Sequence, residues 1–156
     1  MRMRRSRIKK AADAAERQEE NMEKNTVLNN GAVWYDTDGN VLHAHGGHML
    51  FHEGYWYWYG ENRTENRYVS VYRSEDLLNW TFCRHALTTD SPTAEHRVRT
   101  DRKLKNTDGG KINVERPKVL YNEKIGKFVM WMHVEKGKNY HGAACGIAVL
   151  DRPDGE

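Results

Sequence analysis

The chain has 156 residues and a net charge of +3, and this length is typical of a single domain. Residues 1–25 hold eight Lys and Arg against five Asp and Glu, so the rest of the chain carries no net charge. Without a clustered basic face, nucleic acid is disfavoured as the main partner. No stretch is long and apolar enough to span a membrane, and the N-terminus lacks the apolar core of a secretory signal. The sequence as written therefore predicts no membrane partner and a cytoplasmic location.

Residues 7–24 are the one long stretch with a helical pattern, because they combine alanines with alternating charged side chains. Their apolar face is little more than alanine, which predicts a solvated helical extension outside the folded body. The predicted boundaries are 1–28 for this extension and 29–156 for the body. The lack of a bulky apolar stripe also disfavours a membrane anchor.

Residues 33–42 predict a short hairpin around a turn at 36–40. The sequence Asp-Thr-Asp-Gly-Asn of this turn resembles the start of a calcium loop. Its glycine, however, stands fourth instead of sixth, and Gly47 takes the place of the bidentate glutamate. A simple turn is therefore the favoured interpretation.

Residues 43–61 predict two strands joined by a tight turn at 52–54, in which Gly54 supplies a positive φ. The second strand, residues 55–59, is entirely aromatic, which suits a pleated sheet better than a helix. Tyrosines and tryptophans alternate along it, so they face opposite sides of the sheet and both sides should be covered. Glu61 follows this strand and places a carboxylate at the end of an aromatic sheet. It is a candidate ligand-binding group, and the alternative is a merely solvated strand end.

The further predicted strands are residues 68–72, 80–87, 113–121, 128–133 and 145–150. A charged insertion at 88–112 is typical of a binding rim or a disordered loop, and the strand pattern repeats after it. Strand pairs that recur at this spacing predict an all-β fold of radially repeated sheets, a β-propeller. A propeller needs about four or more blades, and this chain supplies fewer than two complete ones. We therefore expect it to be the N-terminal part of a longer protein.

The histidines of the segment 43–52 suggest zinc, but no residue stands at a convincing third ligand position, so no metal site and no cofactor are predicted. His45 stands beside two glycines that allow a ligand close to the backbone, which makes it a candidate for substrate binding. Cys83 and Cys145 have no metal-binding spacing. We expect them to be buried free thiols, with a disulfide as the alternative.

Glu115 is the strongest candidate for a site residue, because it lies at the start of a first strand of the repeat, next to Arg116. First strands line the central channel of a propeller, so Glu115 should face the axis near His45. The neighbouring Arg116 guanidinium is expected to keep the Glu115 carboxylate ionised. The alternative is a surface ion pair between the two residues.

Several ordered motifs resemble glycoside hydrolase family 43, and most closely its exo-β-1,3-galactanases and related galactosidases. The resemblance covers about residues 31–156. The motifs are Asn-Val-Leu-His-Ala-His-Gly-Gly at 40–47, Tyr-Trp-Tyr-Gly-Glu at 57–61, Val-Tyr-Arg-Ser-Glu-Asp-Leu-Leu-Asn-Trp at 71–80, Glu-Arg-Pro-Lys-Val-Leu-Tyr-Asn at 115–122 and Phe-Val-Met-Trp-Met-His at 128–133. The resemblance implies a five-bladed propeller, of which about two blades are present, with a pocket on its axis for the terminal sugar.

The resemblance also implies inverting hydrolysis, in which an acid protonates the leaving oxygen and an opposed group activates water. Glu115, the predicted catalytic residue, matches the glutamate of the family's second blade, which holds the sugar and tunes the acid. Glu61 and Tyr140 match sugar contacts, and Arg116, His45 and His133 complete the predicted substrate-binding set.

Two departures from the family pattern affect this interpretation. Where most of the family has an aspartate base on the first blade, this chain has Ala44-His45-Gly46, a loss that the galactanase branch shares. The general acid of the family belongs to a blade beyond Glu156, so the isolated chain is expected to be inactive.

The leading hypothesis is part of a glycosidase that releases terminal β-galactosyl residues from β-1,3-galactan or arabinogalactan side chains. Its partner would be an oligosaccharide or polysaccharide, and the missing C-terminal blades are expected in the same polypeptide. The alternatives are an α-L-arabinofuranosidase or β-xylosidase of the same fold, a non-catalytic carbohydrate-binding fragment, or an interaction module that uses the charged helix.

Overall fold

The computed structural model describes residues 24–93, 104, 110–136 and 140–155. The predicted helix at 7–24 lies, except for Lys24, outside the described residues, as does most of the insertion at 88–112. The described residues form strands and no helix, so none of their segments is a helix that could cross a membrane. Residues 33–156 make up one compact unit, which contains all the strands.

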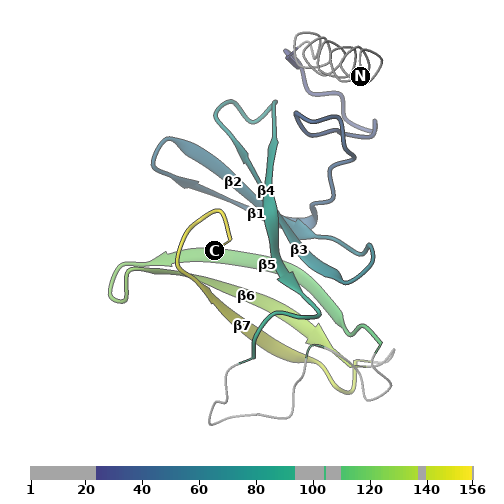
Figure 1. Ribbon diagram of the computed structural model, residues 1–156, viewed down its shortest axis with the longest axis vertical. Coiled ribbons are helices and arrows are strands. Elements are labelled where there is room, and N and C mark those ends of the chain that lie inside the picture. The colour runs from purple at the N-terminus through teal and green to yellow at the C-terminus, as the bar shows by residue number, and fades with distance from the viewer. Residues whose placement is uncertain (1–23, 94–103, 105–109, 137–139, 156) are drawn as a thin grey trace, which may run out of the picture. The chain divides into compact units, whose positions relative to one another are not determined.

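Within the described ranges, seven strands form two antiparallel sheets (Figure 1). The first sheet has the order β1-β2-β3-β4 and the second the order β5-β6-β7. The strands are β1 His45–His52, β2 Tyr55–Glu61, β3 Arg67–Ser74, β4 Thr81–Thr88, β5 Asn113–Asn122, β6 Lys127–Glu135 and β7 Ala144–Leu150. The all-β partial propeller predicted from the repeat is thus confirmed: one four-stranded blade is followed by three strands of a second.

The aromatic strand β2 lies inside the first sheet, between β1 and β3. Gly54 has a φ of 86°, which permits the tight turn between β1 and β2 as predicted. Tyr57 and Tyr59 belong to the core between the two sheets, whereas Trp56 and Trp58 pack on the opposite face. Both faces of β2 are therefore covered, as its alternating pattern predicted.

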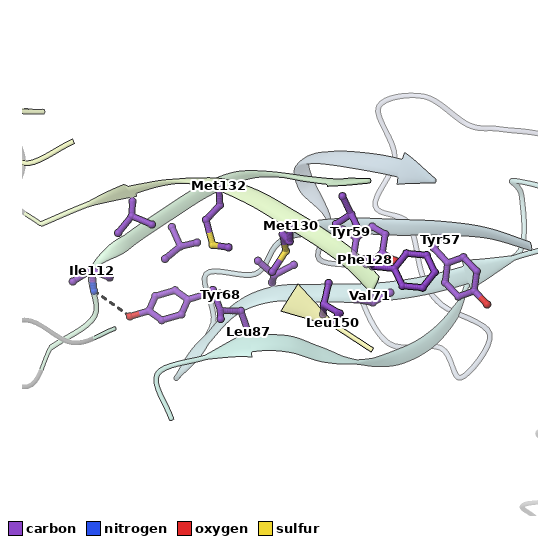
Figure 2. Close-up of a cluster of buried hydrophobic side chains, with 14 residues drawn as sticks. Tyr57, Tyr59, Tyr68, Val71, Leu87, Ile112, Phe128, Met130, Met132 and Leu150 are labelled. Carbon is purple, nitrogen blue, oxygen red and sulfur yellow. Dashed lines mark hydrogen bonds between the residues drawn. The ribbon is translucent and has the colours of Figure 1, made fainter. Parts of the chain in front are cut away.

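The main core fills the space between the two sheets (Figure 2). Met130 and Phe128 of the second sheet lie there with Val71 and Tyr59 of the first. Next to this core, the hydroxyl of Tyr68 accepts a hydrogen bond from the backbone N–H of Ile112 at 3.2 Å. Apolar burial on this scale is the main force that holds the two sheets together.

The opposite face of the second sheet is open. Paired residues in an antiparallel sheet share a face, and Trp131 pairs with both Lys118 and Ile147. The exposed large apolar side chains of this face are Leu120, Trp131, Ile147 and Val149. Cys145 also lies on this side of β7 and is exposed, while Cys83 is half-buried, and both are free thiols. The expectation that Cys145 is buried was therefore wrong, because it assumed a covered sheet.

Two histidines of the segment 43–52, His48 and His52, make contacts between the sheets. The ring of His48 accepts a hydrogen bond at Nδ1 from the backbone N–H of Val119. The ring of His52 packs against that of Phe128 with centroids 4.9 Å apart. Both contacts join β1 to the second sheet. The turn at 36–40 is confirmed as well, since Asp36 Oδ1 accepts hydrogen bonds from backbone N–H groups within it.

Candidate functional site

The candidate site lies where β1 and β2 of the first sheet meet β5 of the second. His45 at the start of β1 pairs with Glu61 at the end of β2. The register of β1 shifts after His45, and Gly46 has a φ of 56°. A bulge of this kind redirects the backbone at a strand end. It leaves the His45 side chain exposed and the Glu61 side chain almost fully buried, at 2% exposure.

The Glu61 carboxylate accepts hydrogen bonds on both oxygens. The backbone N–H of Arg116 donates to Oε1 at 3.0 Å, and Nε and Nη2 of Arg63 donate to Oε2 at 3.2 and 2.9 Å. The Nδ1 atom of His45 lies 3.5 Å from Oε2. Burial by itself raises the pKa of Glu61, but these donors outweigh it and hold the pKa below its usual value. Glu61 is therefore a buried carboxylate that stays ionised at neutral pH.

Glu115 joins the same group through Arg63. Its Oε1 accepts a hydrogen bond at 3.1 Å from Nη2 of Arg63, the nitrogen that also binds Glu61. The Glu115 side chain is 22% exposed, so it remains accessible to a ligand. One guanidinium thus holds a carboxylate from each sheet.

Glu115 pairs with a different guanidinium from the predicted one of Arg116. Its ion-pair partner is Arg63, and Arg116 serves Glu61 through its backbone N–H. The reason is local backbone geometry: Arg116 has a φ of 54° and lies in a register shift between Glu115 and Lys118. That conformation turns the Arg116 amide toward the neighbouring sheet.

Glycine at position 46 makes room for this arrangement. A Cβ atom on Gly46 would lie 2.7 Å from Oε1 of Glu61, which is too close for a real contact. The backbone here is also tied to the second sheet, because Nζ of Lys118 donates to the carbonyl oxygens of Gly46 and Gly47 at 3.3 and 2.8 Å. Gly46 therefore leaves room for the Glu61 carboxylate, and Lys118 ties this part of the first sheet to the second.

His133 and Tyr140 extend the site along the second sheet. His133 on β6 pairs with Glu115 on β5, and its ring lies 5.9 Å from the exposed ring of Tyr140. Nε2 of His133 also lies 3.9 Å from Oε2 of the buried Glu135. A cavity of about 470 Å³ opens beside these residues, with Arg116, Trp131 and His133 among its lining side chains.

The six predicted site residues thus fall into two adjoining groups. In the first group, His45 and the Arg116 amide contact Glu61, and Arg63 joins Glu61 to Glu115. In the second group, His133 pairs with Glu115 and lies beside Tyr140. Arg63 and Glu135 were not predicted from the sequence. The only sequence signal for Arg63 is its position two residues after a strand-end glutamate. In the described part of the chain, no group of three or more His, Cys, Asp or Glu side chains is placed to hold a metal ion.

Comparison with protein-family models gave no match, and comparison with curated proteins gave no significant one. Solved structures do match. The chain is 43% identical to an exo-β-1,3-galactanase from Clostridium thermocellum, with a TM-score of 0.68, over 83% of this chain and 26% of that one. It is 43% identical to a family 43 β-1,3-galactosidase studied with galactodeoxynojirimycin, with a TM-score of 0.65, over 82% of this chain and 36% of that one. An exo-β-1,3-galactanase from Phanerochaete chrysosporium with galactose is 37% identical, with a TM-score of 0.64, over 80% of this chain and 27% of that one.

The two antiparallel sheets and these matches show that the chain has the fold of part of a propeller of the kind found in these proteins. The resemblance to glycoside hydrolase family 43, with its exo-β-1,3-galactanases and β-1,3-galactosidases, is confirmed, and the chain is a relative of that family over the part that it spans. That part is between 26% and 36% of the length of these three structures.

Proposed function

We propose that this chain forms the first blades of a glycosidase that releases terminal β-galactosyl residues from β-1,3-galactan or arabinogalactan side chains, with inversion. The observation that carries the proposal is the pair of carboxylates, Glu61 and Glu115, held together by Arg63. The proposal is supported by the galactanase and galactosidase activities named for proteins 37–43% identical to this chain.

The chemistry of the site suits a sugar. Carboxylates accept strong hydrogen bonds from hydroxyl groups, and Glu115 is both ion-paired and partly exposed. The exposed ring of Tyr140 offers an apolar surface for a sugar face. The exposed His45 ring offers a nitrogen near Glu61, and His133 lies on the strand next to Glu115. Glu115 would bind the terminal sugar and influence the acid, as the family resemblance implies.

Inverting hydrolysis also requires a general acid and a group that activates water, about 6.5–9.5 Å apart. We assign neither role to a described residue. We propose that both come from further blades of the same polypeptide, in keeping with the 26–36% of related structures that this chain spans. The open apolar face of Leu120, Trp131, Ile147 and Val149 would then be covered by the next blade.

The test is galactose release from β-1,3-galactan by the complete protein expressed from its natural gene. Glu115→Gln removes the charge but keeps the shape, and it is expected to lower kcat/KM by about tenfold to a hundredfold, the cost of losing a hydrogen bond to a charged group. Glu123→Gln is the matched control, because Glu123 lies exposed beyond the far end of β5. Unchanged turnover in Glu115→Gln would contradict the proposal.

Two alternatives give different results in the same assays. An arabinofuranosidase or β-xylosidase would cleave the corresponding nitrophenyl glycosides in preference to the galactoside. A non-catalytic sugar-binding protein would show a sugar-dependent change of tryptophan fluorescence without hydrolysis. This second alternative is favoured by the described residues themselves, which include hydroxyl-binding carboxylates but no assigned general acid.

A further inference from the structure

Arg63 lies in the connection between β2 and β3, and the chain holds this connection in place. Asn62 is buried, and its Nδ2 donates to Oγ of Ser70 at 2.9 Å. The other side-chain atom, Oδ1, accepts from the backbone N–H and the hydroxyl of Thr64. The residues on both sides of Arg63 are therefore fixed, so its guanidinium leaves the loop in a defined direction.

The guanidinium makes three contacts that a lysine could not reproduce. Its Nε and Nη2 both bind Oε2 of Glu61, while Nη2 also binds Oε1 of Glu115. A planar fork can bind one oxygen with two nitrogens and reach a second carboxylate at the same time, whereas an ammonium group is a single point of charge. Without a cation between them, two carboxylates this close would repel each other and favour protonation of one.

We propose that Arg63 is a positioning residue that locks the side chains of Glu61 and Glu115 into one unit oriented toward the sugar. The sugar named as the ligand in this inference rests on the proposed function, whereas the contacts of Arg63 do not depend on it. It differs from an ordinary surface ion pair in one respect: the Arg63 side chain is 69% exposed, yet one of its partners is 98% shielded from solvent. Such a buried carboxylate depends on its partners far more than an exposed one does.

The two carboxylates should respond differently to the loss of Arg63. Glu61 keeps the Arg116 amide and the nearby His45 ring, whereas Arg63 is the described ion-pair partner of Glu115. Removal of Arg63 should therefore raise the pKa of Glu61 with little movement, and should release the Glu115 side chain from its orientation. Ligand binding should weaken chiefly through Glu115.

The experiment compares Arg63→Met, Arg63→Lys and a matched control, Arg73→Met, in the complete protein expressed from its natural gene. Arg73 is exposed near the far end of β3, and its guanidinium lies over the Tyr55 ring, so its loss should leave the site intact. The first readout is the pKa of the Glu61 carboxyl in the ligand-free protein, followed by ¹³C NMR. This pKa should rise in Arg63→Met, rise less in Arg63→Lys and stay unchanged in Arg73→Met.

The second readout is the dissociation constant for β-1,3-galactobiose, which should increase about tenfold or more in Arg63→Met, as expected for the loss of a hydrogen bond to a charged group. A Glu61 pKa that does not move in Arg63→Met overturns the inference. If that pKa moves but the wild-type protein binds no galactobiose, the proposed function fails and the positioning role of Arg63 stands.

Discussion

The two sheets have the same strand pattern, but they differ in how far each of their faces is buried. The first sheet is covered on both faces, by the shared core on one side and by the cluster around Trp80 on the other. The second sheet contributes one face to the shared core and leaves Trp131 on the other face 44% exposed. The sheets also differ in their site carboxylates, since Glu61 is buried and fixed from several directions whereas Glu115 is partly exposed.

This difference separates two tasks within one site. The first sheet supplies a rigid frame, because its carboxylate is held by a backbone amide and by side chains. The second sheet supplies the group that can still reach a ligand. Arg63 couples the two, so the frame determines the orientation of the accessible carboxylate.

The difference in how far the faces of the two sheets are buried should have its largest effect when a tryptophan is removed from each. Trp80 is 1% exposed and packs against Trp58 with ring centroids 5.1 Å apart. In the 156-residue chain, Trp80→Ala should lower the free energy of unfolding by about 3–5 kcal/mol, the usual cost of a buried tryptophan. Trp131→Ala should cost about 1 kcal/mol or less, because its side chain is half exposed. Urea unfolding measures both, and equal losses would contradict the comparison.

A methyl group on Gly60 should have the next largest effect, because it tests the close approach of β2 to Ala44, the residue before β1. A Cβ atom on Gly60 would lie 2.1 Å from the Cα of Ala44, and neither backbone can move away without breaking the pairing. Gly60→Ala should therefore cost about 3 kcal/mol, the upper range for overpacking. Gly54→Ala is the control, since nothing lies within 4 Å of its Cβ and only the positive φ is strained. It should cost about 1 kcal/mol, and a control as damaging as Gly60→Ala would argue against a close-approach effect.

The pH dependence of stability should reveal the fixed carboxylate with a smaller effect. The pKa of Glu61 is lower in the folded state than its ordinary value of 4.5. Folding is therefore stabilised above that pH, and the contribution is lost as the pH falls through the folded pKa. Wild type should exceed Glu61→Gln in stability by about 1–2 kcal/mol near pH 7. The gap should close below pH 4.5, and a gap that widens on acidification would show that Glu61 is not held as an anion.

The sequence predicted the features that depend on local periodicity. Alternation along residues 55–59 assigned Tyr57 and Trp58 to opposite faces, since a strand turns successive side chains by half a turn. Glu61 and Glu115 could be selected because they stand at strand ends that a repeating fold brings together.

The contacts that connect the two sheets could not be predicted. Arg63 reaches Glu115 only because buried Asn62 fixes the loop, and the Arg116 amide faces Glu61 only because that residue adopts a positive φ in a bulge. The exposure of Cys145 likewise depends on what covers the second sheet, which local sequence does not encode.

The most direct test of the central claim is a crystal structure of the complete protein, expressed from its natural gene, with galactose bound. The account predicts a sugar hydroxyl within hydrogen-bond distance of the Glu115 carboxylate, while Arg63 still bridges Glu115 to Glu61. Galactose bound out of reach of both carboxylates would contradict it.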